Sequence, residues 1–335
     1  MPATTRRPFA AMAFCILLAP VLSFAPPAVA SGPAEPLRLS SGMIVATGPT
    51  EHPPLIEYPA FAEDLWHMPT VAVSPAPPVD SQAYDWYVLP DGLLYRSYLA
   101  GPHEPRISSI LFGDGDGGFF WDATLGARVG LLRYGTHGAR NPSGWQWDVE
   151  GAVVTRLNML ESQDVEAADY RVGTLLTRAE GRWAAKLGYF HVSSHIGDEF
   201  IVRNPGYVRD NYVTESAILG VSFDQSDAIR LYGETAYAFH VAGKAKHWQF
   251  QTGAEYSPLA TYTRRGAPFA AINLQMLEAV DFSPAMNMQT GWQWKSPQSG
   301  RSLRTGLTYF NGHSTQYQFL HTSEQQVGGG VWFDY

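Results

Sequence analysis

The chain is poor in cysteine, in charged residues and in long apolar runs, and each shortage excludes a class of protein. Cys15 is the only cysteine, so no disulfide can form within the chain. Beyond residue 30 no stretch is long and apolar enough for a membrane-spanning helix. Charged residues make up 16% of the chain and the formal net charge is -8, which argues against nucleic-acid binding.

Residues 1–30 have the three parts of a signal peptide. Arg6 and Arg7 form a positive start, residues 9–25 an apolar stretch, and residues 28–30 an Ala-Val-Ala cleavage site. The sequence therefore predicts an exported protein whose only cysteine is removed with the signal.

The remainder is rich in aromatic residues and glycine, and its polarity alternates with period 2. Aromatics make up 13% of the chain, and the alternation defines about twelve segments. They are 106–113, 119–133, 145–157, 168–179, 182–195, 211–224, 228–241, 248–257, 267–280, 285–296, 301–312 and 324–335. Low charge, many aromatics and an even number of alternating strands predict an all-β, transmembrane antiparallel barrel.

The predicted organisation is a signal peptide (1–30), an N-terminal periplasmic segment (31–105) and an outer-membrane barrel (106–335). Residues 31 to about 87 are rich in proline and lack periodicity, so we expect an extended linker or strap there. Charges of both signs fall on the inward parity of the strands, and we expect them to pair across the lumen and fill it. They are Arg128, Asp148, Glu150, Arg171, Lys186, Arg230, Glu234, Glu255, Lys295 and Arg304.

The chain ends in an alternating aromatic strand. Val331, Phe333 and Tyr335 share one parity, and the last residue is aromatic. This resembles the signature by which the barrel assembly machinery recognises outer-membrane proteins, although Gly328 stands at its usual polar position. The resemblance implies the outer membrane of a Gram-negative bacterium, with that machinery and outer-membrane lipids as partners.

Polar residues interrupt the apolar parity of two neighbouring segments. His191, Ser193 and His195 continue the apolar face of 182–195, and Asn211 and Glu215 lie on the apolar face of 211–224. Polar groups are costly on a lipid-facing wall, which marks them as functional candidates. Near the membrane interface that cost falls towards zero, so these residues could also be ordinary rim residues.

His191-Val192-Ser193 resembles the His-x-Ser motif of outer-membrane phospholipase A and of the lipid A deacylase barrels. The resemblance implies a serine hydrolase of lipid esters, with Ser193 as nucleophile, His191 as base and Glu215 or Asn211 as third member. In those families the third residue follows the serine by about a dozen positions, which here falls at Pro205.

The oxyanion donors of such an enzyme would have to be loop amides near residues 194–197. By resemblance to the phospholipase, Asp198 and Glu199 are candidate Ca²⁺ ligands. Two adjacent acids in a loop are also commonly just solvated, and they lack the spacing of an EF-hand.

Three stretches, LPDGLLYRSYLAGPHEPR (89–106), SSHIGDEF (193–200) and VRNPG (202–206), resemble a family of outer-membrane proteins catalogued as a domain of unknown function. This resemblance covers the chain from about residue 88 onward and implies a barrel without supplying an activity. The alternative to an enzyme is therefore a structural, interaction or narrow transport barrel.

Removal of residues 333–335 should block barrel assembly, because the last strand closes the barrel and would lose its recognition signature. The measurement is the amount of heat-modifiable protein in outer-membrane fractions. Normal amounts of assembled protein after this truncation would show that the terminal match is coincidental.

Overall fold

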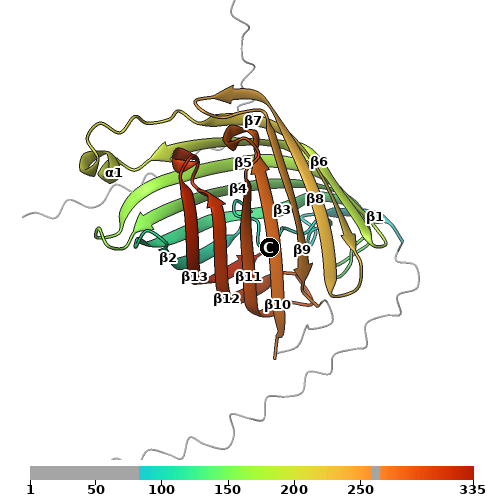
Figure 1. The fold of residues 1–335 in the computed structure, drawn as a ribbon. Helices are drawn as coiled ribbons and strands as arrows, with labels where there is room; N and C mark the ends of the chain where they lie inside the picture. Colours follow the sequence, from blue (N-terminus) through green and yellow to red (C-terminus); the bar gives the residue numbers. More distant parts are fainter. Residues whose placement is uncertain (1–82, 259–264) are drawn as a thin grey trace, which may run out of the picture. The chain divides into compact units, whose positions relative to one another are not determined.

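The computed structural model describes residues 83–258 and 265–335, and these form a closed antiparallel β-barrel (Figure 1). Twelve strands make the wall, as the alternation predicts. They are β2 (Ile107–Asp114), β3 (Phe119–Gly135), β4 (Gly144–Asn158), β5 (Asp164–Glu180), β6 (Trp183–Ile196), β7 (Val213–Asp224), β8 (Ile229–Ala242), β9 (Trp248–Tyr256), β10 (Ala267–Leu277), β11 (Pro284–Lys295), β12 (Ser302–His313) and β13 (Ser323–Asp334). The predicted signal peptide and residues 31–82 of the predicted N-terminal segment lie outside the described residues.

Closure depends on the last strand. β13 pairs with β12 on one side and with β2 on the other, where Phe333 lies opposite Ile107 and Gln326 opposite Asp114. The barrel therefore has no free edge between β2 and β13, which satisfies the backbone groups of a lipid-facing wall. A short extra strand, β1 (Asp85–Val88), pairs with β3 beyond the end of β2.

Side chains alternate between lipid and lumen as the sequence predicts. On β4, Trp145 and Trp147 are exposed, while Gln146, Asp148 and Glu150 are buried inside. Exposed aromatics gather near both ends of the wall, as in the aromatic girdles of membrane barrels. Trp145, Trp183 and Trp294 lie towards the end that holds the C-terminus, and Phe119, Phe239 and Trp248 towards the other.

Within the described ranges, no helix is long and apolar enough to cross a lipid bilayer.

The end of the predicted N-terminal segment, beyond the expected strap, enters the barrel. Residues 89–106 form neither strand nor helix, and much of this stretch is buried among lumen-facing side chains. Tyr98, for example, stacks on Tyr232 of β8 with ring centroids 3.8 Å apart. Residues 89–106 are therefore an internal segment of the barrel. Its carbonyl oxygens accept hydrogen bonds from wall arginines, in addition to the acceptors that the wall itself offers these arginines.

Inward charges pair, although with charges on nearby strands rather than across the lumen as expected. Lys186 lies 2.6 Å from Glu234, Arg230 lies 2.9 Å from Glu255, and Arg171 lies 2.8 Å from Glu150. Arg304 pairs with Asp334 at 2.8 Å and also donates to Gln289 and to the Leu99 carbonyl oxygen. The interior of the barrel is thus a connected polar core.

Arg304→Met should lower the stability of the assembled barrel by about 3 kcal/mol, because it leaves buried acceptors without their donor. Arg209→Met is the matched control, since Arg209 is exposed in the β6–β7 loop and a surface change of this kind costs little. The readout is the unfolding midpoint in detergent, followed by circular dichroism and gel mobility. Equal midpoints for the two variants would contradict the role given to Arg304.

Candidate functional site

The candidate site lies on the outer wall, near the end of the barrel opposite the C-terminus. Tyr189, His191, Ser193 and His195 are all partly or well exposed on β6, whereas the residues between them are buried in the lumen. These side chains therefore point outward, as their parity in the sequence predicts. In Figure 1, β6 and β7 lead into the 197–212 loop, which contains α1 (Asp198–Arg203).

His191 and Glu215 form the centre of this cluster. They are cross-strand partners on β6 and β7, and His191 Nδ1 lies 2.9 Å from Glu215 Oε1. Tyr189 donates its hydroxyl to the other carboxylate oxygen, Oε2. Glu215 is thus held by two donors from one face of β6.

This contact fixes the tautomer of the imidazole. A carboxylate accepts, so Nδ1 of His191 carries the proton that faces Glu215. In a neutral ring, Nε2 then bears the free lone pair. That is the arrangement a general base needs when a carboxylate orients it.

Ser193 follows His191 on the same face of β6. Same-face neighbours have Cα atoms about 6.6 Å apart, within reach of a histidine leaning along the strand. In the described part of the chain, the Ser193 hydroxyl makes no hydrogen bond, either to His191 or to another group. Catalytic hydrogen bonds are often longer before substrate binds. Ser193 and His191 can therefore still be nucleophile and base, although no hydrogen bond joins them in this structure.

The two candidates for the third member differ in position. Glu215 faces His191 directly, whereas Asn211 precedes β7 and lies two residues beyond Val213, the cross-strand partner of Ser193. Asn211 is exposed, and its side chain contacts no polar group of the described chain. The register therefore selects Glu215.

The loop amides expected to serve as oxyanion donors are engaged elsewhere. The Ser194 amide donates to the Tyr212 carbonyl at 3.1 Å, and the Gly197 amide donates to the Glu166 carbonyl at 2.9 Å. An oxyanion at Ser193 would need side-chain donors instead. His195, two residues further along the same face, packs edge-on against Tyr170, the partner of Ser193 on β5.

Asp198 and Glu199, the candidate Ca²⁺ ligands, lie at the start of the β6–β7 loop helix. Both are exposed in the first turn of α1. Across the described ranges, no three His, Cys, Asp or Glu side chains gather in a group that could hold a metal ion.

Two residues of the cluster could not be singled out from sequence. Tyr189 is part of the alternating apolar face, and only the diagonal approach of its hydroxyl to Glu215 distinguishes it. His240 is the β8 partner of Glu215, because a bulge at residues 215–216 shifts the register by one. Without the bulge, the parity of β8 would place His240 inside.

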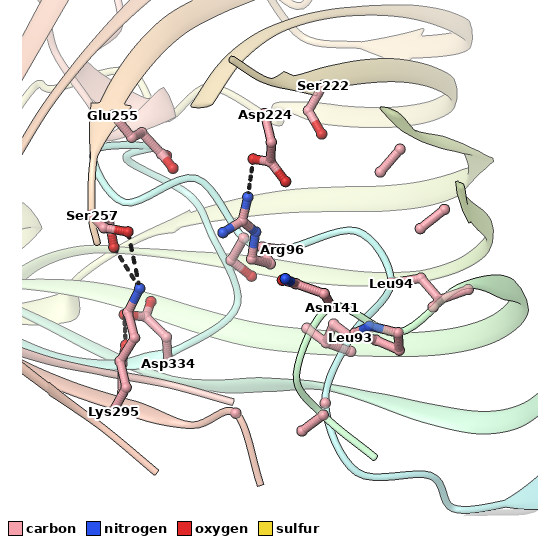
Figure 2. A pocket seen from close by; sticks show the side chains of 18 of the residues that line it. Leu93, Leu94, Arg96, Asn141, Ser222, Asp224, Glu255, Ser257, Lys295 and Asp334 are labelled. Atoms are coloured by element: carbon pink, nitrogen blue, oxygen red, sulfur yellow. Dashed lines mark hydrogen bonds and ion pairs between the residues drawn. The ribbon is translucent and has the colours of Figure 1, made fainter. Parts of the chain in front are cut away.

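A separate cavity of about 120 Å³ lies inside the lumen at the end that holds the C-terminus (Figure 2). Arg96 of the internal segment pairs with Asp224 there, and Lys295 donates to Ser257 Oγ at 2.6 Å. Most of its charges are thus already engaged within the chain. It lies at the opposite end of the barrel from His191 and takes no part in the outer-wall cluster.

Comparisons with known proteins give a family and distant structural likenesses. A family model described as "Protein of unknown function (DUF1207)" matches residues 70–335. No curated protein matches the chain.

Similar solved structures include outer membrane phospholipase A from Escherichia coli, at 13% identity and a TM-score of 0.45, over 69% of this chain and 91% of that one. A Salmonella typhi outer membrane phospholipase dimer with bound calcium gives 12% identity and a TM-score of 0.46, over 69% and 91%. KdgM porin gives 6% identity and a TM-score of 0.39, over 68% and 98%. Likenesses this distant carry no argument about activity.

Proposed function

The chain belongs to the DUF1207 family of proteins of unknown function, and we propose that it is a serine hydrolase of lipid acyl esters working on the outside of an outer-membrane barrel. One observation carries the proposal. On the outer wall, a carboxylate holds His191 by Nδ1 and leaves Nε2 free, and Ser193 follows on the same face of the strand.

The position of the cluster suits a lipid ester. It faces outward, beyond the apolar rows of Leu187 and Leu219 and near the strand ends remote from the C-terminus. If the C-terminus is periplasmic, this is the depth of the headgroups and upper acyl chains of the outer leaflet. A substrate reaches Ser193 by lateral diffusion in the membrane, and no passage through the lumen is required.

The reaction follows from the roles of the three residues. Ser193 Oγ attacks the ester carbonyl while its proton passes to His191 Nε2, and the collapse of the tetrahedral intermediate returns that proton to the leaving alcohol. Water then repeats the sequence on the acyl-enzyme and releases the fatty acid. Glu215 orients His191 and stabilises the imidazolium, while Tyr189 holds Glu215.

The oxyanion is assigned to side-chain donors, because the nearby loop amides are engaged. His195 is the candidate, since it lies on the same face as Ser193. Its removal should lower kcat more than it raises KM, because the interaction exists only in the transition state.

The second candidate function is a non-enzymatic structural or interaction barrel. It is favoured by the absence, among the described residues, of a hydrogen bond between Ser193 and His191. On either function, the proposed location is the outer membrane of a Gram-negative bacterium, reached through the barrel assembly machinery.

Ser193→Ala and His191→Ala should each reduce fatty-acid release from phospholipid or lipid A by about 10³-fold or more, because members of one catalytic unit fail together. Glu215→Ala should reduce it by about 10²–10⁴-fold, since the base loses its orientation. Asn211→Ala is the matched control and should retain activity. The assay uses purified protein in mixed micelles, with heat-modifiability as the check on assembly.

Equal release by wild type and Ser193→Ala would eliminate the enzyme and leave the structural barrel. Loss of activity in Asn211→Ala with retention in Glu215→Ala would instead show that the third member is misassigned.

A further inference from the structure

We propose that residues 89–106 and the β12–β13 loop (314–322) form a two-part plug that closes the lumen to ions and solutes, joined at Asp169. The inference concerns the inside of the barrel and stands independently of the outer-wall hydrolase. It rests on the contacts of each part with the wall, on the contact between the parts, and on the small size of the cavities beside them.

The first part of the plug is the internal segment, held mainly by its backbone. Four wall arginines donate to its carbonyl oxygens, and Arg106, the last residue of the segment itself, is a fifth donor. They are Arg133 to Asp91 and Gly92, Arg128 to Tyr95, Arg230 to Arg96 and Ser97, Arg106 to Tyr98 and Leu99, and Arg304 to Leu99. Because the four wall donors come from β3, β8 and β12, the segment is held from several sides of the lumen.

Side chains of the same segment fill the remaining space. Tyr95 and Tyr98 are fully buried, and their hydroxyls lie 2.7 Å apart. Lys186 of β6 lies over both rings, at 4.9 and 4.6 Å from the centroids. Glu255 accepts the Leu99 amide at 2.7 Å. Few polar groups of the segment are therefore left free to line a water-filled path.

The second part folds in from the end opposite the C-terminus. Tyr317 of η3 (Tyr317–Phe319) and Leu320 are buried in an apolar cluster with Phe190, Val192 and Ile218 from the wall. Gln318 fixes this loop, because its amide donates to the carbonyl oxygens of Ser194 at 2.9 Å and Asp210 at 2.8 Å. An apolar, close-packed region of this kind excludes water.

The two parts meet at one carboxylate. The rings of His103 and Tyr317 stack with centroids 4.6 Å apart. Asp169 of β5 is buried; its Oδ2 lies 3.3 Å from His103 Nε2 and accepts the Tyr317 amide at 3.1 Å, while its Oδ1 accepts the Ser194 hydroxyl. One wall residue thus binds the tip of the internal segment and the inward loop together.

The cavities beside the plug are small. They include one of about 120 Å³ at the end that holds the C-terminus, one of about 50 Å³ beside Gly101 and Glu104, and one of about 10 Å³ beside Tyr212. A single water needs about 10–15 Å³, so the largest space holds about ten waters and the smallest about one, and the three spaces share no lining residue.

The test is conductance in planar lipid bilayers. Full-length wild type should insert without stable current steps. A variant in which residues 93–103 are replaced by an equal number of Gly and Ser residues should give stable steps, with heat-modifiability as proof of assembly. Stable steps from wild type would overturn the proposal, as would a closed lumen in the assembled replacement variant.

Asp169→Asn tests the junction without deleting either part. It should keep the barrel assembled and produce brief, flickering openings at least tenfold more frequent than in wild type. Asp227→Asn, an equivalent change in the exposed β7–β8 turn, should stay closed. If Asp169→Asn opens no more often than wild type, Asp169 does not hold the two parts of the plug together.

Discussion

Hydrogen bonds from wall arginines to the carbonyl groups of residues 89–106 hold this segment inside the barrel, and the filled interior depends on them. A buried segment without helix or strand must find donors for its carbonyl oxygens, and a guanidinium supplies up to five from one side chain. The same arginines gain acceptors in addition to the wall carboxylates and amides that they already bind. Because each side satisfies the other, the interior becomes a solid core.

Because the interior is filled, the outer wall is the surface on which a substrate could bind. There the polar cluster around His191 and Glu215 lies on the outer face, and under the proposed function its substrate would arrive in the membrane plane. The apolar belt below the cluster follows from the alternation that also brings the charges inside. One period-2 pattern thus produces both the polar core and a lipid-facing site.

The strands and the outward parity of the site could be predicted, because a period of two carries that information locally. The internal segment could not, since its partners lie far away in sequence and it has no periodicity of its own. Arg304 and Leu99, for example, are separated by 205 positions. Glu215 could be separated from Asn211 only by strand register, and His240 was hidden by a bulge. The sequence predicted that inward charges of opposite sign would pair, but it did not identify which residues pair with each other.

Hydrogen–deuterium exchange of the assembled protein in detergent tests the central claim most directly. Peptides covering residues 93–101 should exchange as slowly as those from the neighbouring strands, because the segment is buried and the Leu99 amide is bonded to Glu255. Peptides from the exposed 198–210 loop provide the fast reference in the same sample. Exchange of residues 93–101 at the rate of that loop would show that the segment does not occupy the lumen, and the account of a filled barrel would fail.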